Sequence, residues 1–297
     1  MSRPVRLIVN PSSGGGRALQ ELPKAEAALA RLGVTYAVHP TTDLEHGREL
    51  ARAGVDNGEL VTTLSGDGLV GAVAGAMAGR PGAVLGILPA GRGNDLARVL
   101  GIPRDDIDAA CAILRDGTER ALDLGRVDGA PYVGIASLGF DSEANRIANE
   151  APSWLGPMVY AYAALRAIAA WEPATFTIRA DGGPERVVRG WSVGLCNNKA
   201  YGGGMYVAPD AELDDGLLDL VSCADMPKRR FITKMLPAAF KGRTGELAEV
   251  TTQRVREAHI SADRPFVVYA DGDPIGALPA TFTVDPAAVR VMVPRTP

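Results

Sequence analysis

The N-terminal part of the chain alternates short apolar runs with longer segments that have a helical pattern or composition. The apolar runs predict strands over residues 5–9, 35–38, 60–64 and 84–88. Apolar residues at helical spacing predict a helix over residues 22–32, a polar segment predicts one over residues 45–52, and a segment of small residues predicts one over residues 69–78. Pro23 is placed to begin the first of these helices. Because strands that alternate with helices form parallel sheets covered on both faces, we expect a doubly wound α/β domain over residues 1–121.

The pattern changes after residue 121, where short apolar runs follow one another through tight turns. These runs predict strands over residues 122–127, 132–135, 175–180, 187–196, 217–221, 259–262 and 266–269. Helices are expected only over residues 142–149, 157–170 and 227–241. Many short strands joined by turns indicate an antiparallel sandwich, so we expect a second, β-rich domain over residues 122–285. A last apolar run, 289–293, fits either domain and leaves open whether residues 286–297 complete the first.

Three glycine-rich turns follow predicted strands of the first domain. They are Asn10-Pro11-Ser12-Ser13-Gly14-Gly15-Gly16, Ser65-Gly66-Asp67-Gly68 and Ala90-Gly91-Arg92-Gly93-Asn94-Asp95. Ligands of parallel sheets bind beyond the carboxyl ends of the strands, and the N–H groups of such turns bind phosphate. Each turn alone is also explained as a flexible turn or a capped helix start, with Asp67, Asn94 or Asp95 as the cap. Their convergence favours a phosphate site.

Because of Asp67, phosphate binding alone does not explain the second glycine-rich turn. A carboxylate beside a phosphate needs a cation or a sugar hydroxyl between them, so the second turn is typical of a nucleotide that binds with its metal. We expect Gly66 and Gly68 to let the backbone approach a phosphate, and Asp67 to orient the metal or its water shell. Arg92 in the third turn adds a flexible cation that can reach a phosphate.

Two acidic turns occur in the second domain. Residues 208–217 combine carboxylates with a tight turn, which can hold a hard cation such as Mg²⁺, although a hairpin turn with exposed acids explains them equally well. Asp271 and Asp273 flank Gly272 at the end of a predicted strand. They could supply a general base, but an Asp-Gly hairpin turn is the favoured explanation on spacing alone.

Composition excludes several classes of protein. The formal net charge of the 297-residue chain is −4, which argues against a nucleic-acid partner. The sequence contains no run of 18 apolar residues and no leader pattern, so we expect a cytoplasmic protein that does not span a membrane. The three cysteines, Cys111, Cys196 and Cys223, suggest neither a disulfide framework nor a zinc site.

Taken together, these motifs resemble the diacylglycerol kinase catalytic-domain family of soluble lipid kinases, which includes sphingosine and ceramide kinases and many bacterial members. The motifs that carry the resemblance are Asn10-Pro11 with its glycine-rich tail, Gly66-Asp67-Gly68, residues 85–95, the Gly202–Gly204 loop with Ala208-Pro209 and Asp215-Gly216-Leu217, and Asp271-Gly272-Asp273-Pro274. Each motif is weak, but five of them in this order and spacing, over nearly the whole chain, are specific.

The resemblance implies that ATP binds between a nucleotide-binding α/β domain and a β-rich lipid-substrate domain, and that its γ-phosphoryl group passes to the hydroxyl of a diacylglycerol-like lipid. The nucleotide-binding positions that it implies are Asn10, Thr41 or Thr42, Ser65, Gly66, Asp67, Gly68, Leu69, Gly91, Arg92, Asn94 and Asp95. It also implies a Mg²⁺ held by the Asp215 side chain and the main chain of Glu212 and Leu217. The implied catalytic residues are Asp273 as proton acceptor and Asp67 beside the catalytic Mg²⁺.

The second glycine-rich turn departs from the family pattern Gly-Gly-Asp-Gly-Thr. Ser65 replaces the first glycine, Leu69 replaces the threonine, and in the third turn Arg92 stands where a threonine is common. Losing the hydroxyl at position 69 removes one donor, which costs about 1–3 kcal/mol if that bond is buried. Arg92 could offset the loss through a charge-assisted contact.

Two other functions stay open at this point. One is a kinase of a soluble substrate on the same scaffold, as in nicotinamide-dinucleotide kinases, and the other is a nucleotide- or lipid-binding protein without catalysis. The segment 202–217 favours a lipid kinase, and the retention of Asp67, Asp215 and Asp273 favours an enzyme. For a lipid kinase we expect peripheral contact with the inner face of the membrane, for which the basic residues of 228–243 are candidates, although a solvated helix face explains them too. The oligomeric state is left open, with a homodimer among the options.

Overall fold

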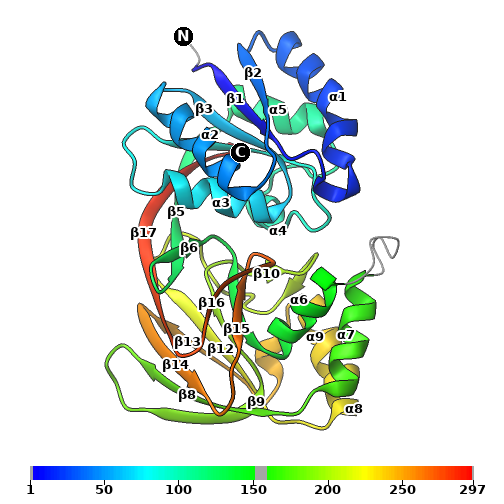
Figure 1. Cartoon of the computed structure of the whole chain (residues 1–297), viewed down its shortest axis with the longest axis vertical. Helices are drawn as coiled ribbons and strands as arrows, with labels where there is room; N and C mark the ends of the chain where they lie inside the picture. The colour runs from blue at the N-terminus through cyan, green and yellow to red at the C-terminus, as the bar shows by residue number, and fades with distance from the viewer. Residues whose placement is uncertain (1–2, 151–158, 296–297) are drawn as a thin grey trace. The chain divides into compact units, whose positions relative to one another are not determined.

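The computed structural model describes residues 3–150 and 159–295 (Figure 1). The chain divides into two compact units. One unit comprises Met1–Leu124 with Ala287–Pro297, and the other comprises Gly125–Pro286. The chain passes between the units within two strands, β5 (Thr118–Val127) and β17 (Ala280–Val293).

The first unit is built on a parallel sheet with the strand order β17–β4–β3–β1–β2. Its strands are β1 (Val5–Val9), β2 (Tyr36–Pro40), β3 (Leu60–Ser65), β4 (Val84–Pro89) and the C-terminal part of β17. Every residue of β1, β3 and β4 is buried, as expected for a sheet covered on both faces. The predicted parallel-sheet domain is confirmed.

Helices cover the two faces of this sheet in pairs (Figure 1). Helix α1 (Arg17–Arg31) packs with α5 (Ile107–Asp116), and α2 (Leu44–Asp56) packs with α3 (Asp67–Met77). A short helix, α4 (Asp95–Val99), follows the third glycine-rich turn.

The predicted start of the first helix at Pro23 is wrong. Helix α1 begins at Arg17, and Pro23 lies inside it with an exposed ring. The three glycines before the helix have φ values of +61°, +71° and +96°, so they turn the chain directly into it. Burial of Ala18 then stabilises the first turn, and only the hydrogen bond that a proline cannot donate is lost.

The second unit is an antiparallel sheet system centred on β9 (Arg186–Cys196). Strand β9 pairs with β7 (Ile135–Gly139), β8 (Ala174–Ala180) and β12 (Leu218–Ala224). The outer strands are β13 (Val250–Val255), β14 (Glu257–Ala262), β15 (Val267–Ala270), β16 (Asp273–Ala277) and the N-terminal part of β17. The predicted β-rich antiparallel domain is confirmed.

Three hairpins of this unit turn on an Asp-Gly pair. Strand β5 turns into β6 (Ala130–Tyr132) at Asp128-Gly129, β8 into β9 at Asp181-Gly182, and β15 into β16 at Asp271-Gly272. Both residues of each pair have positive φ, from +47° to +93°. This is the left-handed backbone of a type I′ turn, which Asp and Gly tolerate best.

The helices of the second unit pack against an aromatic cluster. They are α6 (Phe140–Glu150), α7 (Val159–Ala170) and a continuous helical segment made of α8 (Lys228–Arg230), the π-helical turn η3 (Phe231–Met235) and α9 (Leu236–Phe240). Trp191 stacks on Phe231 at 3.9 Å between ring centroids, and Phe140 meets both rings edge-on. The start of the predicted helix 157–170 lies outside the described residues.

Candidate active site

The three glycine-rich turns meet in the first unit. A Cβ added at Gly91 would lie 2.3 Å from the Gly66 Cα, and one added at Gly14 would lie 2.5 Å from the Ala90 carbonyl oxygen. Ser13 belongs to the same group, because its Oγ would lie 3.4 Å from a Cβ at Gly66. Only glycine allows backbones to approach this closely. Segments far apart in the sequence thus form one backbone-lined corner at the carboxyl ends of β1, β3 and β4.

Asp67 connects the second turn to the third. Its carboxylate accepts the main-chain N–H of Asp95 at 3.1 Å and that of Leu96 at 3.2 Å. It does not cap its own helix, because the N-cap of α3 is Gly66 and makes no side-chain bond. Asn94 occupies the N-cap position of α4 but makes no side-chain bond there, and Asp67 accepts the N–H groups of Asp95 and Leu96. The capping explanation therefore fails for Asp67 in its own helix, whereas for Asn94 only the N-cap position is confirmed.

The environment of Asp67 disfavours its charge. Burial raises the pKa of the Asp67 carboxyl, and the nearby Asp95 carboxylate raises it further, while main-chain N–H groups of the third turn oppose the shift. Asp95 is itself buried and pairs with Arg98 at 3.4 Å. A cation beside Asp67 would relieve this cost. No three His, Cys, Asp or Glu side chains gather around a metal position in the described part of the chain, so a Mg²⁺ at Asp67 would take its other ligands from phosphate and water.

Asn94 folds the third turn. Its Oδ1 accepts the N–H of Gly91 at 2.8 Å, and its Nδ2 donates to the Gly91 carbonyl at 3.0 Å. Asn94 is buried and has a left-handed φ of +52°, which asparagine tolerates better than most residues. Arg92 lies exposed at the tip of the loop that this pair closes.

The first turn and the start of α3 supply further donors. Asn10 Oδ1 accepts from the N–H of Ser12 at 3.1 Å and from its hydroxyl at 2.9 Å, which shapes the turn. The N–H groups at positions 67, 68 and 69 belong to the first turn of α3 and have no acceptor within the helix. Ser65 is buried, and its hydroxyl donates to the Gly66 carbonyl at 3.2 Å.

Thr41 and Leu69 face into the fold rather than toward the turns. The Thr41 hydroxyl donates to the Asp43 carbonyl at 2.5 Å. The Leu69 side chain is buried against α2, where a Cβ at Gly47 would lie 2.5 Å from Leu69 Cδ1. At position 69, the main-chain N–H is therefore the group available to a phosphate.

The two acids around Gly272 have different surroundings. Asp271 is a structural residue, since its carboxylate accepts the N–H of Val133 at 2.9 Å and that of Gly134 at 2.8 Å. Asp273 is exposed at the start of β16. Its charge is one of several that act on Tyr269, whose pKa is raised mainly by burial. Of the two acids, Asp273 is the more exposed to solvent.

The acidic turn before β12 contains one incompletely satisfied carboxylate. Asp215 Oδ1 accepts the Leu217 N–H at 3.0 Å, whereas Oδ2 is buried and has no hydrogen-bond partner among the described residues, with Arg254 3.5 Å away. Burial raises the pKa of the neighbouring Asp219 to about 6, with Arg254 opposing and nearby carboxylates adding to the shift. The Glu212 side chain is exposed. Asp215 Oδ2 therefore has an ion pair with Arg254 but no hydrogen bond among the described residues, and a buried carboxylate oxygen of this kind can serve as a ligand of a hard cation.

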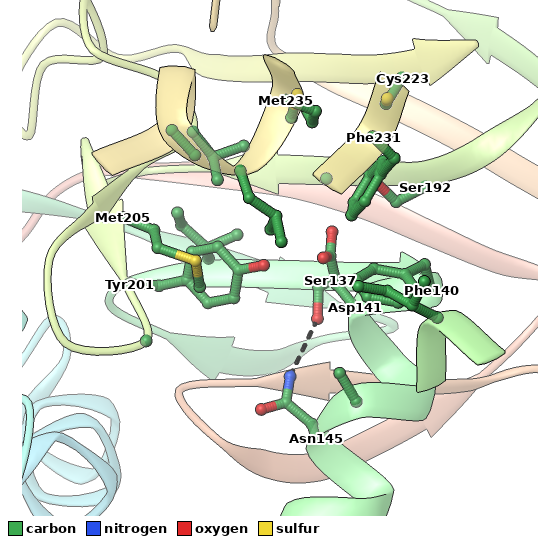
Figure 2. Close-up of a pocket in the computed structure, with 18 of the residues that line it drawn as sticks. Ser137, Phe140, Asp141, Asn145, Ser192, Tyr201, Met205, Cys223, Phe231 and Met235 are labelled. Atoms are coloured by element: carbon green, nitrogen blue, oxygen red, sulfur yellow. Dashed lines mark hydrogen bonds between the residues drawn. The ribbon is translucent and has the colours of Figure 1, made fainter. Parts of the chain in front are cut away.

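An apolar cavity of about 580 Å³ lies in the second unit, between the sheet and the helices (Figure 2). Its walls are mostly aliphatic and aromatic side chains from α6, α7, η3 and α9. Asp141, Tyr201 and Ser192 form a polar group within it. Burial raises the pKa of the Asp141 carboxyl, against which the hydroxyls of Tyr201 and Ser192 act as hydrogen-bond donors. The size and lining suit the chain of a lipid.

Sequence reasoning missed this cavity and Asp141. The cavity is assembled from elements spread over more than a hundred residues, and Asp141 stands in a stretch without a chemical motif. The sequence of α7 could have indicated the cavity. Eleven of the twelve residues Val159–Ala170 are apolar or aromatic, and Arg166 is the exception. A helix that is apolar on all sides needs a second apolar surface besides the sheet.

Comparison with known proteins identifies the chain. Residues 4–127 match the family model of the diacylglycerol kinase catalytic domain, and residues 134–293 match that of the YegS C-terminal NAD kinase beta sandwich-like domain. A diacylglycerol kinase of Mycobacterium tuberculosis is 36% identical over 298 residues, which cover 98% of this chain and 95% of the relative. The chain belongs to the diacylglycerol kinase family. It is a lipid kinase, and its family uses ATP.

Other members of the diacylglycerol kinase family agree over the same length. A diacylglycerol kinase of Bacillus subtilis is 27% identical over 98% of this chain and 96% of its own. A protein of Pseudomonas aeruginosa named probable lipid kinase YegS-like is 30% identical over 98% of this chain and 94% of its own. A crystal structure of a diacylglycerol kinase of Bacillus anthracis shares the fold, with a TM-score of 0.74 at 19% identity over 98% of this chain and 97% of that one.

Membership of the diacylglycerol kinase family confirms the resemblance drawn from the motifs. It disfavours the nicotinamide-dinucleotide kinase alternative, because the sandwich of this chain is the YegS type and follows a diacylglycerol kinase catalytic domain. None of the described helices is long and apolar enough to cross a membrane.

Proposed function

We propose that the protein transfers the γ-phosphoryl group of ATP to the hydroxyl of a diacylglycerol-like lipid. The observation that carries the choice of substrate is the apolar cavity, whose volume of about 580 Å³ and few polar groups suit an acyl chain rather than a soluble metabolite. The curated relative that is 36% identical to this chain is named a diacylglycerol kinase, which supports the same choice. In this proposal the first unit binds the nucleotide and the second binds the lipid, which a peripheral contact takes from a membrane.

In the proposed nucleotide site, the glycine-rich corner and the first N–H groups of α3 bind the phosphates. Asn94 positions the third turn by closing it around Gly91, and the Arg92 guanidinium neutralises phosphate charge from the exposed tip. Asp67 holds the second and third turns together and provides a carboxylate for a cation. When bound there, Mg²⁺ supplies charge neutralisation on the phosphates.

In the proposed transfer step, Asp273 accepts the proton of the lipid hydroxyl as its oxygen attacks the γ-phosphorus. The bond from that phosphorus to the β,γ-bridging oxygen breaks, and ADP leaves with the electron pair. Such reactions depend on positioning and charge neutralisation more than on covalent chemistry. The carboxylate of Asp215 with the main-chain carbonyls of Glu212 and Leu217 forms a second, structural Mg²⁺ site in this proposal.

The test is a product analysis. The purified protein is incubated with isotope-labelled ATP, Mg²⁺ and a total lipid extract, and the labelled products are identified by mass spectrometry. A parallel reaction offers soluble alcohols and nicotinamide dinucleotide. We expect labelled phosphatidic acid from the lipid extract, and at least a hundredfold less of it from the Asp273→Asn variant. Labelled dinucleotide, or ATP binding without any labelled product, would instead support one of the two other functions.

A further inference from the structure

The helical segment Lys228–Phe240 and its following loop carry an unusual concentration of positive charge. Residues 226–243 contain six basic side chains and no acidic one, although the whole chain has a net charge of −4. Three of these bases are engaged: Arg230 pairs with Glu249 at 2.7 Å, Arg243 pairs with Glu246 at 2.6 Å, and Lys228 donates to the Ala169 carbonyl at 2.7 Å.

The other three bases are exposed and lack acidic partners. Arg229, Lys234 and Lys241 form no ion pair with any residue that the structure describes. Positive side chains in this state are complementary to a surface of negative charge.

Exposed apolar side chains occur in the same helical segment and on α7. Ile232 is 43% exposed, Phe240 is 59% exposed, and Leu165 of α7 is 66% exposed. All three also line the apolar cavity, so they mark its mouth. Six large apolar side chains are exposed among the described residues, and these three are half of them. Exposed apolar residues are usually scattered singly over a surface, whereas these three gather at one opening.

The π-helical turn η3 both fills the core and presents side chains outward. Phe231 and Met235 of this turn are buried, and Phe231 stacks on Trp191. Ile232 and Lys234, between them, are exposed. Turns of this kind are rare and frequently occur at functional sites.

We propose that Leu165, Ile232, Phe240, Arg229, Lys234 and Lys241 form a docking face for an anionic lipid bilayer. The apolar members enter the bilayer at the mouth of the cavity, and the basic members contact phosphate or other anionic headgroups. An acyl chain then passes from the bilayer into the cavity without exposure to water. The inference rests on the lipid substrate of the proposed function, and it adds the surface from which that substrate is taken.

Binding to vesicles tests the docking face directly. The full chain is sedimented with vesicles of phosphatidylcholine alone or mixed with phosphatidylglycerol, at low and high salt. We expect binding to the mixed vesicles that weakens with salt. Ile232→Ser with Phe240→Ser should weaken it at least tenfold, and Lys234→Glu with Lys241→Glu should weaken it by fivefold or more per charge.

Matched controls change another exposed apolar residue and another exposed basic residue elsewhere in the second unit. Val187→Ser removes a side chain that is 65% exposed on β9, and Arg256→Glu reverses an exposed charge outside the face. Both should bind vesicles as the unaltered protein does, and circular dichroism checks that every variant is folded. Equal loss in controls and test variants would overturn the proposal, as would binding that does not depend on the anionic lipid.

A second measurement separates this inference from the proposed function. A short-chain diacylglycerol below its micellar concentration reaches the enzyme from solution, so Lys234→Glu with Lys241→Glu should phosphorylate it at the unaltered rate while losing activity on mixed vesicles. Failure of the unaltered protein to phosphorylate either form refutes the proposed substrate, whereas the vesicle-binding result still decides the docking face. If the same variants instead dissociate a dimer in solution, the face is an interface between copies and the inference is wrong.

Discussion

The carboxylate of Asp67 accepts the main-chain N–H of Asp95 at 3.1 Å, and thereby ties the second glycine-rich turn to the third. A side chain expected to serve a ligand is thus also part of the framework that holds the site open. Changes at this position therefore affect both stability and phosphate chemistry, and the two effects have to be measured separately.

Replacing Asp67 by alanine leaves the N–H groups of Asp95 and Leu96 without their acceptor. We expect the free energy of unfolding to fall by about 1–3 kcal/mol, because these donors lie in a largely buried position. The rise in melting temperature that ATP with Mg²⁺ produces should also disappear. Denaturation with and without the nucleotide measures both effects, and Asp67→Asn, which keeps one acceptor, should fall between. Full kinase activity in Asp67→Ala would contradict the proposed role.

Gly91→Ala tests whether the close approach of the turns is needed. The new Cβ would lie 2.3 Å from the Gly66 Cα, so the two backbones must separate. We expect ATP affinity, measured by calorimetry, to fall at least tenfold. Gly245→Ala is the control, since a Cβ there meets nothing within 4 Å. It should leave ATP binding unchanged and can raise the free energy of unfolding by about 0.4–1 kcal/mol. Unchanged affinity in Gly91→Ala would remove the corner from the nucleotide site.

The Asp273 variant should lose activity, whereas the Asp271 variant should lose stability. Asp273→Asn removes a proton acceptor at an exposed position, so we expect kcat to fall by about 10²–10⁴-fold with a change in unfolding free energy within about 0.5 kcal/mol. Asp271→Asn weakens two hydrogen bonds to Val133 and Gly134, which connect β6 to β7, so stability should fall by about 1–3 kcal/mol. Steady-state kinetics and urea denaturation of both variants make the comparison. A fully active Asp273→Asn would assign the proton to another group.

Comparing the protein with and without Mg²⁺ tests whether the acidic turn before β12 binds a cation. Mg²⁺ in the absence of nucleotide should raise the melting temperature of the unaltered protein, because it satisfies the buried Oδ2 of Asp215. The shift should vanish in Asp215→Ala. Glu212→Gln should keep it, since that side chain is exposed and only its main chain is proposed as a ligand. Loss of the shift in Glu212→Gln but not in Asp215→Ala would place the cation elsewhere.

Asp141 should make stability depend on pH. Its pKa is raised by burial, so the folded protein holds this proton more tightly than the unfolded chain does. Stability should therefore decrease as pH rises from the ordinary aspartate pKa of about 4 toward the raised value, and level off above it. Asp141→Asn removes this dependence and should be the more stable form at pH 8. Melting curves across pH check this, and a difference between the two proteins that stays constant with pH would contradict it.

Local sequence was sufficient for features that local chemistry determines. The apolar runs located the strands of the parallel sheet, and the Asp271-Gly272 pair marked a hairpin because few residues accept positive φ. Pro23 misled the prediction of α1, since a helix can contain a proline where other contacts compensate. Local preference gives no information on those contacts.

Relationships between distant segments could not be predicted. Asp67 accepts the N–H groups of Asp95 and Leu96. Every residue except proline has a main-chain N–H, so the sequence does not show which of these groups an acid will bind. The sequence places Leu69 in a phosphate-binding turn, but in the structure its side chain packs against α2. The cavity around Asp141 exists only after separate helices have packed on the second sheet. Tertiary packing, rather than any propensity, decides these positions.

Strand β17 continues from the sheet of the second unit into that of the first, where Arg290 and Val291 pair with β4. The N-terminal sheet therefore acquires its last strand only after the ribosome has made residues 287–293. Until then β4 presents unpaired N–H and C=O groups of the kind that recruit strands from other chains. A fragment truncated at Pro286 would keep that edge permanently, so aggregation of the fragment, rather than simple loss of activity, is the expected result of the truncation.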